Sequence, residues 1–202
     1  MKIYTKTGDD GETGLLGGVR VSKSHLAINA CGALDETNSI IGVCRSAIWT
    51  ERSKLADEVS FDDVDKVLSE IQNDLFDIGS RVASCLGDSR NGSDFPESRS
   101  AELEREIDRF QSELPPLTAF ILPGGSTSGS TLHLARSVCR RSERDLVSLV
   151  QSGIEQPLGR ELIYLNRLGD LLFVLARIAN LRTQFPETQW TARAEKKPDS
   201  ND

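Results

Sequence analysis

Apolar residues recur every three or four positions in five separate stretches of the chain. The clearest stretch is 61–83, where the repeat comprises Val64, Leu68, Ile71, Leu75, Ile78 and Val82. Such spacing places the apolar side chains on one face of an α-helix. The same pattern predicts helices over residues 24–49, 101–114, 131–152 and 161–181. The last of these is apolar around most of its circumference, which is typical of a central helix.

Residues that start or stop helices separate these stretches. Ser24 is the predicted N-cap of the first helix, and Pro115 and Pro116 end the third. Pro123 and the glycines after it prevent residues 117–130 from continuing as a helix, so this stretch is predicted to be a loop that leads into a helix N-terminus. The fold class expected from this order is all-α, an antiparallel bundle of five helices.

The chain is predicted to form one domain. Its 202 residues are enough to bury a substantial core, and no internal repeat divides them. We expect the helical-bundle domain to cover residues 1–190, with a polar N-terminal segment over 1–23. The polar tail, residues 191–202, is expected to be disordered.

Composition narrows the functional classes. Aromatic residues make up 5% of the chain and the formal net charge is -7, which argues against nucleic acid as a partner because phosphate neutralisation needs a basic face. No stretch approaches the roughly 18 apolar residues of a membrane span, and the first residues lack an apolar leader segment, so we expect a cytoplasmic protein without a membrane partner. The four cysteines form no CxxC pair, which argues against a zinc ribbon or a redox motif.

The stretch "HLARSVCRRSERDL" carries the densest cluster of candidate functional residues. On a helix it places one set of charged and polar side chains on an arc beside the apolar stripe: His133, Arg136, Arg140, Glu143 and Arg144. Arginines one turn apart repel each other, so a carboxylate or a bound anion is expected between them. The planar guanidinium fits phosphate oxygens in pairs. A solvated helix face is the alternative interpretation.

Two other helices carry polar residues within apolar patterns. Asp35 falls on the same stripe as small residues such as Cys31, where it is either part of a packed site or a solvated carboxylate. Asn166, Asp170 and Arg177 share a stripe of the last helix. Because buried polar groups need partners, that stripe is either a structural hydrogen-bond network, a subunit interface or part of a site.

The stretch "TKTGDDGETG", Thr5 to Gly14, is rich in glycine, threonine and acidic residues, with one lysine. Glycines let backbone N–H groups turn toward oxygen atoms, and Lys6 adds a positive charge, so the stretch is suited to holding phosphates. Its carboxylates either face away from the phosphates or contact them through Mg2+. A surface turn has the same composition. The later stretch "GGSTSGST" lacks the lysine of a P-loop, and neither histidine has the neighbouring glutamate of a di-iron site.

Several blocks of the sequence resemble, in order, the signature blocks of the PduO-type ATP:cob(I)alamin adenosyltransferases. These blocks are "TKTGDDGETG", "RVSK", "LDETNSIIG", "IQNDLFDIGSRVA", "FILPGG", "LHLARSVCRRSER" and "YLNRLGDLLFVLARIAN", and the resemblance extends over roughly residues 3–182. The resemblance implies a ferritin-like, cobalamin adenosyltransferase-like bundle assembled as a homotrimer, with sites at subunit interfaces. It implies transfer of the 5′-deoxyadenosyl group of ATP to the cobalt of cob(I)alamin, with release of triphosphate.

The resemblance also assigns site residues. ATP would lie between the N-terminal segment of one subunit and helices of its neighbour, with Mg2+ held through the ATP phosphates and no protein ligand of the metal assigned. The implied ATP-binding residues are Thr5, Lys6, Thr7, Gly8, Thr13, Gly14, Lys23, Arg140, Arg141, Ser142, Glu143, Arg144 and Asn166.

Four further residues match positions with catalytic roles. Arg136 and Asp35 match a pair that meets across the subunit interface in the family. Phe120 matches the aromatic residue that expels the lower axial ligand of cobalamin, and Asp170 matches a position near the corrinoid. Cob(I)alamin is itself a strong nucleophile, so the implied reaction needs no nucleophilic side chain or general base. A flavoprotein reductase and an adenosylcobalamin-dependent client enzyme are the implied protein partners.

The chain departs from the family pattern at a few positions. Many members carry arginine and tyrosine in the stretch where this chain has "AINACG", which includes Ala27 and Cys31, so contacts from those side chains are missing or replaced. Gly169 stands where serine is common, and we expect a looser hydrogen bond near Asp170. A non-catalytic trimer that binds nucleotide or cobalamin as a sensor or carrier is the alternative function, and it would not need Asp35, Arg136 or Phe120.

Overall fold

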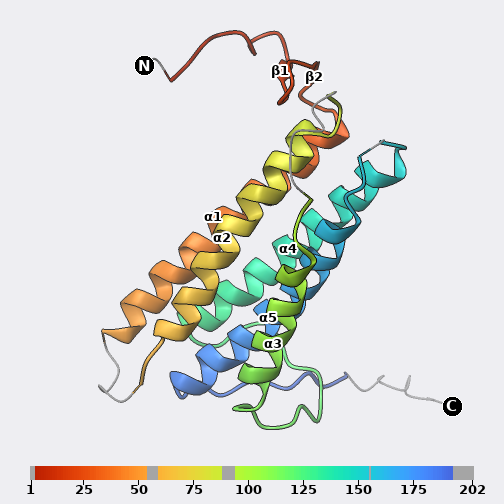
Figure 1. The fold of residues 1–202 in the computed structure, drawn as a ribbon. Helices are drawn as coiled ribbons and strands as arrows, with labels where there is room; N and C mark the ends of the chain where they lie inside the picture. Colours follow the sequence, from red (N-terminus) through yellow and green to blue (C-terminus); the bar gives the residue numbers. More distant parts are fainter. Residues whose placement is uncertain (1–2, 54–58, 88–93, 155, 193–202) are drawn as a thin grey trace, which may run out of the picture.

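Five helices form an elongated antiparallel bundle, which confirms the predicted fold class (Figure 1). The structure is a computed structural model that describes residues 3–53, 59–87, 94–154 and 156–192. Its helices are α1 (Leu26–Arg52), α2 (Asp62–Ser84), α3 (Glu97–Gln111), α4 (Thr127–Gln151) and α5 (Gly159–Arg182). None of these helices carries a stretch long and apolar enough to cross a membrane.

The helix starts differ from the predicted ones where local side chains cap the backbone. The predicted Ser24 cap is wrong, because α1 begins at Leu26 and His25 Nδ1 accepts a hydrogen bond from the N–H of Ala27 at 3.1 Å. The Ser24 hydroxyl instead pairs with Ser22 Oγ. The fourth helix begins at Thr127 rather than 131, because Ser126 Oγ accepts from the N–H of Gly129 at 3.1 Å.

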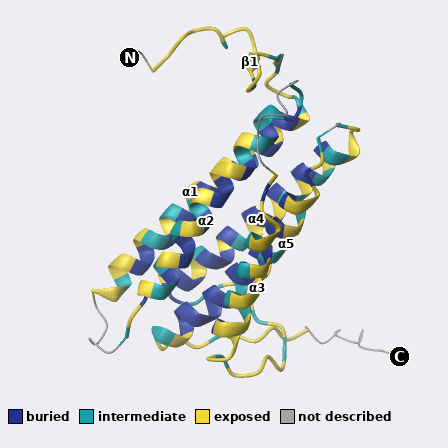
Figure 2. Cartoon of the chain, in the orientation of Figure 1, coloured by how far each residue is buried: buried dark blue, intermediate teal, exposed yellow. Residues whose placement is uncertain are grey.

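The central position predicted for α5 is confirmed. It packs between α3 and α4, and α4 packs along α1 on its other side, while α2 packs on α1. Figure 2 shows dark, buried positions along most of α5. Buried residues on this helix include Leu165, Leu168, Leu172, Leu175 and Ile178. Each such side chain contributes roughly 1.5–3 kcal/mol when it is removed from water, so α5 organises the core.

The loop before α4 is held by residues from two other helices. Asn180 of α5 accepts from the N–H of Ser126 at 3.0 Å and donates to Gly124 O at 3.1 Å. A Cβ atom on Gly125 would lie 2.0 Å from Asn180 Oδ1, so glycine is required there, where φ is also 116°. Glu51 of α1 accepts from the N–H of Thr127 at 2.7 Å, at the positive end of α4.

A short β-hairpin precedes the bundle and was not predicted. Strand β1 (Glu12–Gly14) pairs antiparallel with β2 (Arg20–Ser22), with Thr13 opposite Val21. The hairpin projects beyond one end of the bundle, beside the start of α1 (Figure 1). The next residues attach it, because Leu15 is buried and the N–H of Leu16 donates to Ala83 O at 3.0 Å. Residues 193–202 of the predicted tail lie outside the described residues.

Asp63, in the first turn of α2, joins three helices. It accepts hydrogen bonds from Arg182 at 2.7 Å and from Arg109 at 3.0 Å. Burial by itself raises the pKa of Asp63, but the hydrogen bonds from the two guanidiniums outweigh burial and lower the pKa from 3.8 to about 2. A carboxylate with a depressed folded-state pKa stabilises the fold above its unfolded pKa, and this contribution is lost as the pH falls from 3.8 toward 2.

We therefore expect Asp63→Asn to lower the free energy of unfolding at pH 7 by about 1 kcal/mol, after allowing for solvent screening of a partly exposed group. The difference from the unsubstituted protein should shrink as the pH falls below 4, because the native carboxyl then becomes neutral too. Urea unfolding at a series of pH values measures both effects. Asp77→Asn, at an exposed position of the same helix, is the control. An unchanged gap between Asp63→Asn and the unsubstituted protein at pH 2 would contradict the assignment.

Candidate functional site

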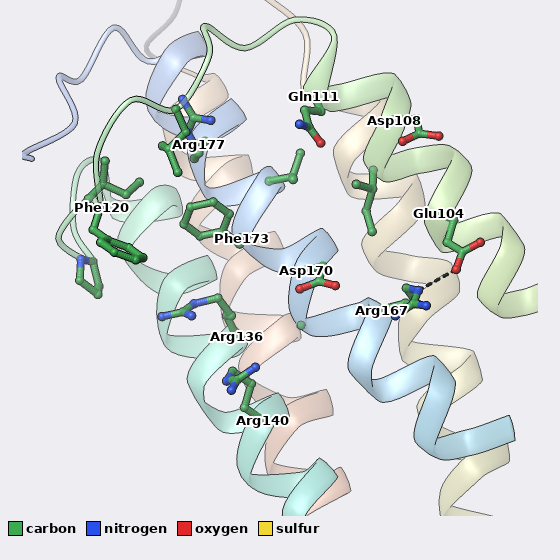
Figure 3. Close-up of a pocket in the computed structure, with 16 residues that line it drawn as sticks. Glu104, Asp108, Gln111, Phe120, Arg136, Arg140, Arg167, Asp170, Phe173 and Arg177 are labelled. Atoms are coloured by element: carbon green, nitrogen blue, oxygen red, sulfur yellow. Dashed lines mark hydrogen bonds and ion pairs between the residues drawn. The ribbon is translucent and has the colours of Figure 1, made fainter. Parts of the chain in front are cut away.

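A pocket of about 800 Å³ opens between α3, α4, α5 and the loop that precedes α4. Figure 3 shows α5 as its floor, α4 on one side and α3 on the other. The lining side chains are Glu104, Ile107, Asp108, Gln111, Leu117, Phe120, Ile121, Pro123, Arg136, Arg140, Arg167, Asp170, Phe173, Val174 and Arg177, with Gly169. The pocket is therefore amphipathic, with apolar walls and several guanidiniums.

The pocket brings together four of the predicted site residues from two helices and the loop. Arg136 and Arg140 project from α4, Asp170 from α5, and Phe120 stands on the loop with 79% of its surface exposed (Figure 3). Phe173 of α5 lies between them, and the centre of its ring is 6.0 Å from the guanidinium carbon of Arg136. A flat, partly apolar ligand could contact the rings while anionic groups contact the arginines.

Arg136, Arg140 and Arg144 form what we call the arginine face of α4. None of the three has an ion pair with a carboxylate among the residues that the structure describes. Within the described ranges, Arg136 Nε is buried without a hydrogen-bond partner, and Arg144 donates only to the Arg140 carbonyl at 2.9 Å. The described part of this chain does not supply the negative group expected between them. The arrangement therefore favours a bound anion over a self-compensated surface.

The neighbouring residues of the same block make contacts within the chain. Arg141 forms an ion pair with Glu36 of α1, and Glu143 accepts from Asn166 at 3.0 Å. Ser142 is fully buried, and its hydroxyl lies 2.7 Å from Thr37 Oγ1. Ser142 thus packs α4 on α1 with its side chain inside the bundle. Its predicted contact with ATP stays a prediction.

The stretch "TKTGDDGETG" is a folded turn that leads into β1. Lys6 has φ 61° and Gly11 has φ 85°, so the backbone turns sharply at both positions. Lys23 reaches back from the end of β2 and donates to Gly8 O at 2.7 Å. Thr5 and Thr7 share a hydroxyl hydrogen bond of 2.9 Å at the exposed surface. The predicted phosphate-holding residues are thereby gathered in one exposed turn.

Arg20 determines where two of the acidic side chains of this turn lie. It donates to Thr7 O at 2.9 Å, and it is 3.4 Å from Glu12 and 3.7 Å from Asp10. These carboxylates therefore have a cation beside them within the turn, which weakens their repulsion of a phosphate. Among the described residues, no group of three histidine, cysteine, aspartate or glutamate side chains is placed to hold a metal ion.

Two sets of predicted site residues are not brought together within one chain. No hydrogen bond or ion pair between described residues joins the N-terminal turn to the arginine face, and the hairpin projects away from the bundle (Figure 1). Asp35 is exposed on α1. Because α1 and α4 are antiparallel, with Thr37 beside Ser142, Asp35 lies near the level of Ser142, while Arg136 lies nearly two turns away along α4.

The structure corrects two polar assignments. His133, which the sequence places on the polar arc with the arginines, is buried with 2% of its surface exposed, and its ring centre lies 5.9 Å from that of Phe173. Burial and the nearby charge of Arg136 lower the pKa of His133, so the imidazole is neutral at pH 7. Of the stripe on α5, Asn166 and Asp170 are exposed, and Arg177 alone is buried.

Sequence reasoning missed the partner of Arg177. Arg177 Nε donates to both carboxylate oxygens of Glu187, at 2.9 and 3.2 Å, and Arg177 Nη2 donates to Pro115 O at 3.1 Å. Glu187 lies beyond the last helix, in a stretch without periodicity that carried no structural signal. The buried arginine itself was the available clue, because a buried charge requires a carboxylate nearby.

The three departures from the family pattern lie in different surroundings. Ala27 is fully buried at the start of α1, and Cys31 is half-buried with its thiol 3.9 Å from Gly79 O. Gly169 lines the pocket, where an added Cβ would lie 3.6 Å from Arg140 Cγ, an ordinary van der Waals distance. The site therefore has room for a Cβ atom at 169, and the expected loosening near Asp170 stays a prediction.

Comparisons with known proteins agree on one family. The family model of cobalamin adenosyltransferase matches residues 3–179. The chain is 40% identical to the corrinoid adenosyltransferase of Bacillus subtilis, covering 96% of this chain and 94% of that one. It is 41% identical to that of Mycobacterium leprae, covering 89% and 91%. A PduO-type ATP:corrinoid adenosyltransferase of Lactobacillus reuteri, complexed with cobalamin and ATP, superposes with a TM-score of 0.83 at 34% identity, covering 95% and 100%.

The uncompensated arginine face predicts that a polyphosphate stabilises the protein. At about a hundredfold excess over its Kd, inorganic triphosphate should raise the Tm by roughly 5–10 °C, measured by differential scanning fluorimetry. We expect Arg140→Gln to remove most of this shift. Arg105→Gln makes the same charge change on α3, outside the arginine face, and should retain the shift. Equal shifts in the two variants would show that the anion binds elsewhere.

Proposed function

The chain belongs to the cobalamin adenosyltransferase family, and on that premise we propose how its residues carry out the reaction. It transfers the adenosyl group of ATP to the cobalt of a corrinoid. The observation that carries the assignment of the site is that the arginine face of α4 adjoins the amphipathic pocket. Arg136 and Arg140 belong to the arginine face and also line the pocket. Anionic phosphates and a large, flat, mostly apolar ring can therefore be bound next to each other.

The cobalt of cob(I)alamin supplies the electron pair that attacks C5′ of ATP. The Co–C5′ bond forms as the C5′–O bond breaks, and the electron pair of the broken bond leaves with triphosphate. No proton is removed from the nucleophile, so the chain needs no general base. The chain contributes in two ways: it aligns the two reactants, and its guanidiniums, already in place, stabilise the negative charge of the departing triphosphate. Each contribution can lower the barrier by several kcal/mol.

On the phosphate side, Arg140 and Arg144 contact the triphosphate, together with Lys6, Lys23 and the backbone of the N-terminal turn. Arg140 and Arg144 have no carboxylate partner among the described residues, which supports this role. Arg141, Glu143 and Asn166 complete the predicted ATP-binding set. Mg2+ enters with ATP and is held through the phosphates in our proposal.

On the corrinoid side, Phe120 contacts the lower face of the ring and displaces the lower axial ligand. The Phe120 side chain is highly exposed at the mouth of the pocket, which supports this role. Covering an apolar ring that is exposed to water is favourable, so the ring is suited to contact a bound ligand. A four-coordinate cobalt(II) is easier to reduce to cobalt(I) than a five-coordinate one. Asp170, on the floor of the same pocket, lies near the corrinoid (Figure 3).

The complete site forms between subunits of a homotrimer in our proposal. The turn over Thr5–Gly14, with Thr7, Gly8 and Thr13, faces the arginine face of the neighbouring subunit, and Asp35 of one subunit pairs with Arg136 of the next. The separation of these groups within one chain supports this arrangement. The reductase, the client enzyme and the cytoplasmic location stay predictions from the sequence.

The reaction is tested by mixing the purified protein anaerobically with Mg-ATP and chemically reduced cob(I)alamin. We expect the visible spectrum to change to that of adenosylcobalamin, with one triphosphate released per corrinoid converted. A protein that binds both ligands without conversion would instead be the sensor or carrier, and our assignment of the reaction would be wrong. Formation of ADP or AMP in place of triphosphate would contradict the proposed bond cleavage, because both products keep the C5′–O bond.

A mixing experiment tests the shared site. Asp35→Ala and Arg136→Ala should each lower kcat at least tenfold when assayed alone. Trimers reassembled from an equal mixture of the two variants contain interfaces that join an intact Asp35 to an intact Arg136. Random assembly restores about a quarter of the sites, so activity should return to roughly a quarter of the original.

The control is the same denaturation and reassembly applied to each variant alone, which should restore nothing. If the mixture stays as inactive as its components, Asp35 and Arg136 do not act across a subunit interface.

A further inference from the structure

The C-terminal segment after α5, residues 183–190, runs back to the loop that carries Phe120. The last helix ends in a tight turn, in which Gln184 has φ 56° and the N–H of Phe185 donates to Asn180 O at 2.8 Å. A residue in the left-handed backbone conformation commonly ends an α-helix in this way and turns the chain away from the helix axis. The segment then lies beside residues 120–122, far away in sequence.

Two main-chain hydrogen bonds join the C-terminal segment to residues on either side of Ile121. The N–H of Trp190 donates to Phe120 O at 2.7 Å, and the N–H of Leu122 donates to Thr188 O at 2.8 Å. Between these bonds, Ile121 and Gln189 face each other as an antiparallel pair. Phe120 itself extends into solvent, so these bonds restrain the backbone that carries its ring.

Main-chain hydrogen bonds alone leave the register of two short segments open, and a side chain provides the anchor. Glu187, next to Thr188, is held by Arg177 of α5, whose side chain is only 7% exposed, while that of Glu187 is 23% exposed. The same guanidinium donates to Pro115 O, at the start of the loop that carries Phe120. One buried cation therefore joins α5, the start of the loop and the C-terminal segment.

We propose that Glu187, held by Arg177, is a positioning residue that fixes Phe120 over the pocket through the backbone pairing of residues 188–190 with 120–122. Glu187 is not among the residues that line the pocket, and we propose that its effect reaches the corrinoid through Phe120. This inference rests on the proposed role of Phe120. A C-terminal stretch without helical pattern would thereby control the coordination state of the cobalt.

The first test removes the charge of Glu187. Glu187→Gln should lower the fraction of four-coordinate cob(II)alamin formed with ATP, measured by visible and EPR spectroscopy, and should lower kcat at least threefold with the KM for ATP unchanged. Glu113→Gln removes a carboxylate that pairs with Arg182 and, among the described residues, forms no hydrogen bond with residues 120–122 or 188–190, so it should leave both quantities as they are. A folded Glu187→Gln protein with the original four-coordinate fraction would overturn the proposal.

A second pair of variants separates the backbone bond from the side chain. Trp190→Pro removes the N–H that donates to Phe120 O, whereas Trp190→Ala keeps this N–H and removes only the indole. We expect Trp190→Pro to lower the four-coordinate fraction and Trp190→Ala to retain it. Thermal unfolding of both variants checks that the bundle is intact. Equal behaviour of the two variants would contradict the role of the backbone pairing.

Two further measurements make the outcome specific. Adding Glu187→Gln to Phe120→Ala should cause no further loss, because both changes act through the same ring. Hydrogen–deuterium exchange of peptides that contain residues 120–122 should become faster in Glu187→Gln and stay unchanged in Glu113→Gln. This exchange needs no turnover, so it still decides the positioning role if the protein fails to convert cob(I)alamin. Additive losses, or unchanged exchange, would count against the proposal.

Discussion

Burial of α5 is the constraint on which the rest of the structure depends. The helix is apolar around most of its surface, so it has to be enclosed, and α3 and α4 do so from two sides. The pocket lies between α3 and α4, with α5 as its floor (Figure 3). The same packing that stabilises the core therefore positions Arg136 and Arg140 opposite Asp170, and it requires α4 to be anchored at its start by Glu51 and Asn180.

Charge is distributed unevenly over this acidic protein. Most arginines that hold helices together have carboxylate partners, as in Arg45 with Asp65, Arg99 with Asp74 and Arg182 with Asp63. The arginine face has none among the described residues, although the chain carries a net charge of -7. A local cluster of cations that are not neutralised costs stability, and in our proposal the bound triphosphate offsets this cost. The electrostatic strain thus lies where the reaction develops negative charge.

In our proposal, one chain contains the corrinoid side of the site and leaves the phosphate side incomplete. The N-terminal turn lies away from the arginine face, and Asp35 lies nearly two turns from Arg136 along the bundle. In our proposal, association of subunits, and not a movement within the bundle, therefore completes the ATP site. This division has a consequence for control. In our proposal, positioning of Phe120 depends on the end of the same chain, whereas positioning of the triphosphate depends on the beginning of a neighbouring one.

Periodicity was enough to predict five helices, the central place of α5 and the loop before α4, because side-chain spacing directly reflects which faces are buried. The arginine cluster and the glycine-rich turn were also identifiable from local residue chemistry. Tertiary structure alone decided the rest. The hairpin, the His25 cap and the burial of His133 depend on which residues come into contact in the folded chain. The local sequence pattern does not predict these contacts. The pairing of Arg177 with Glu187, and of Phe120 with Trp190, joins segments whose contact arises only when the chain reverses after α5.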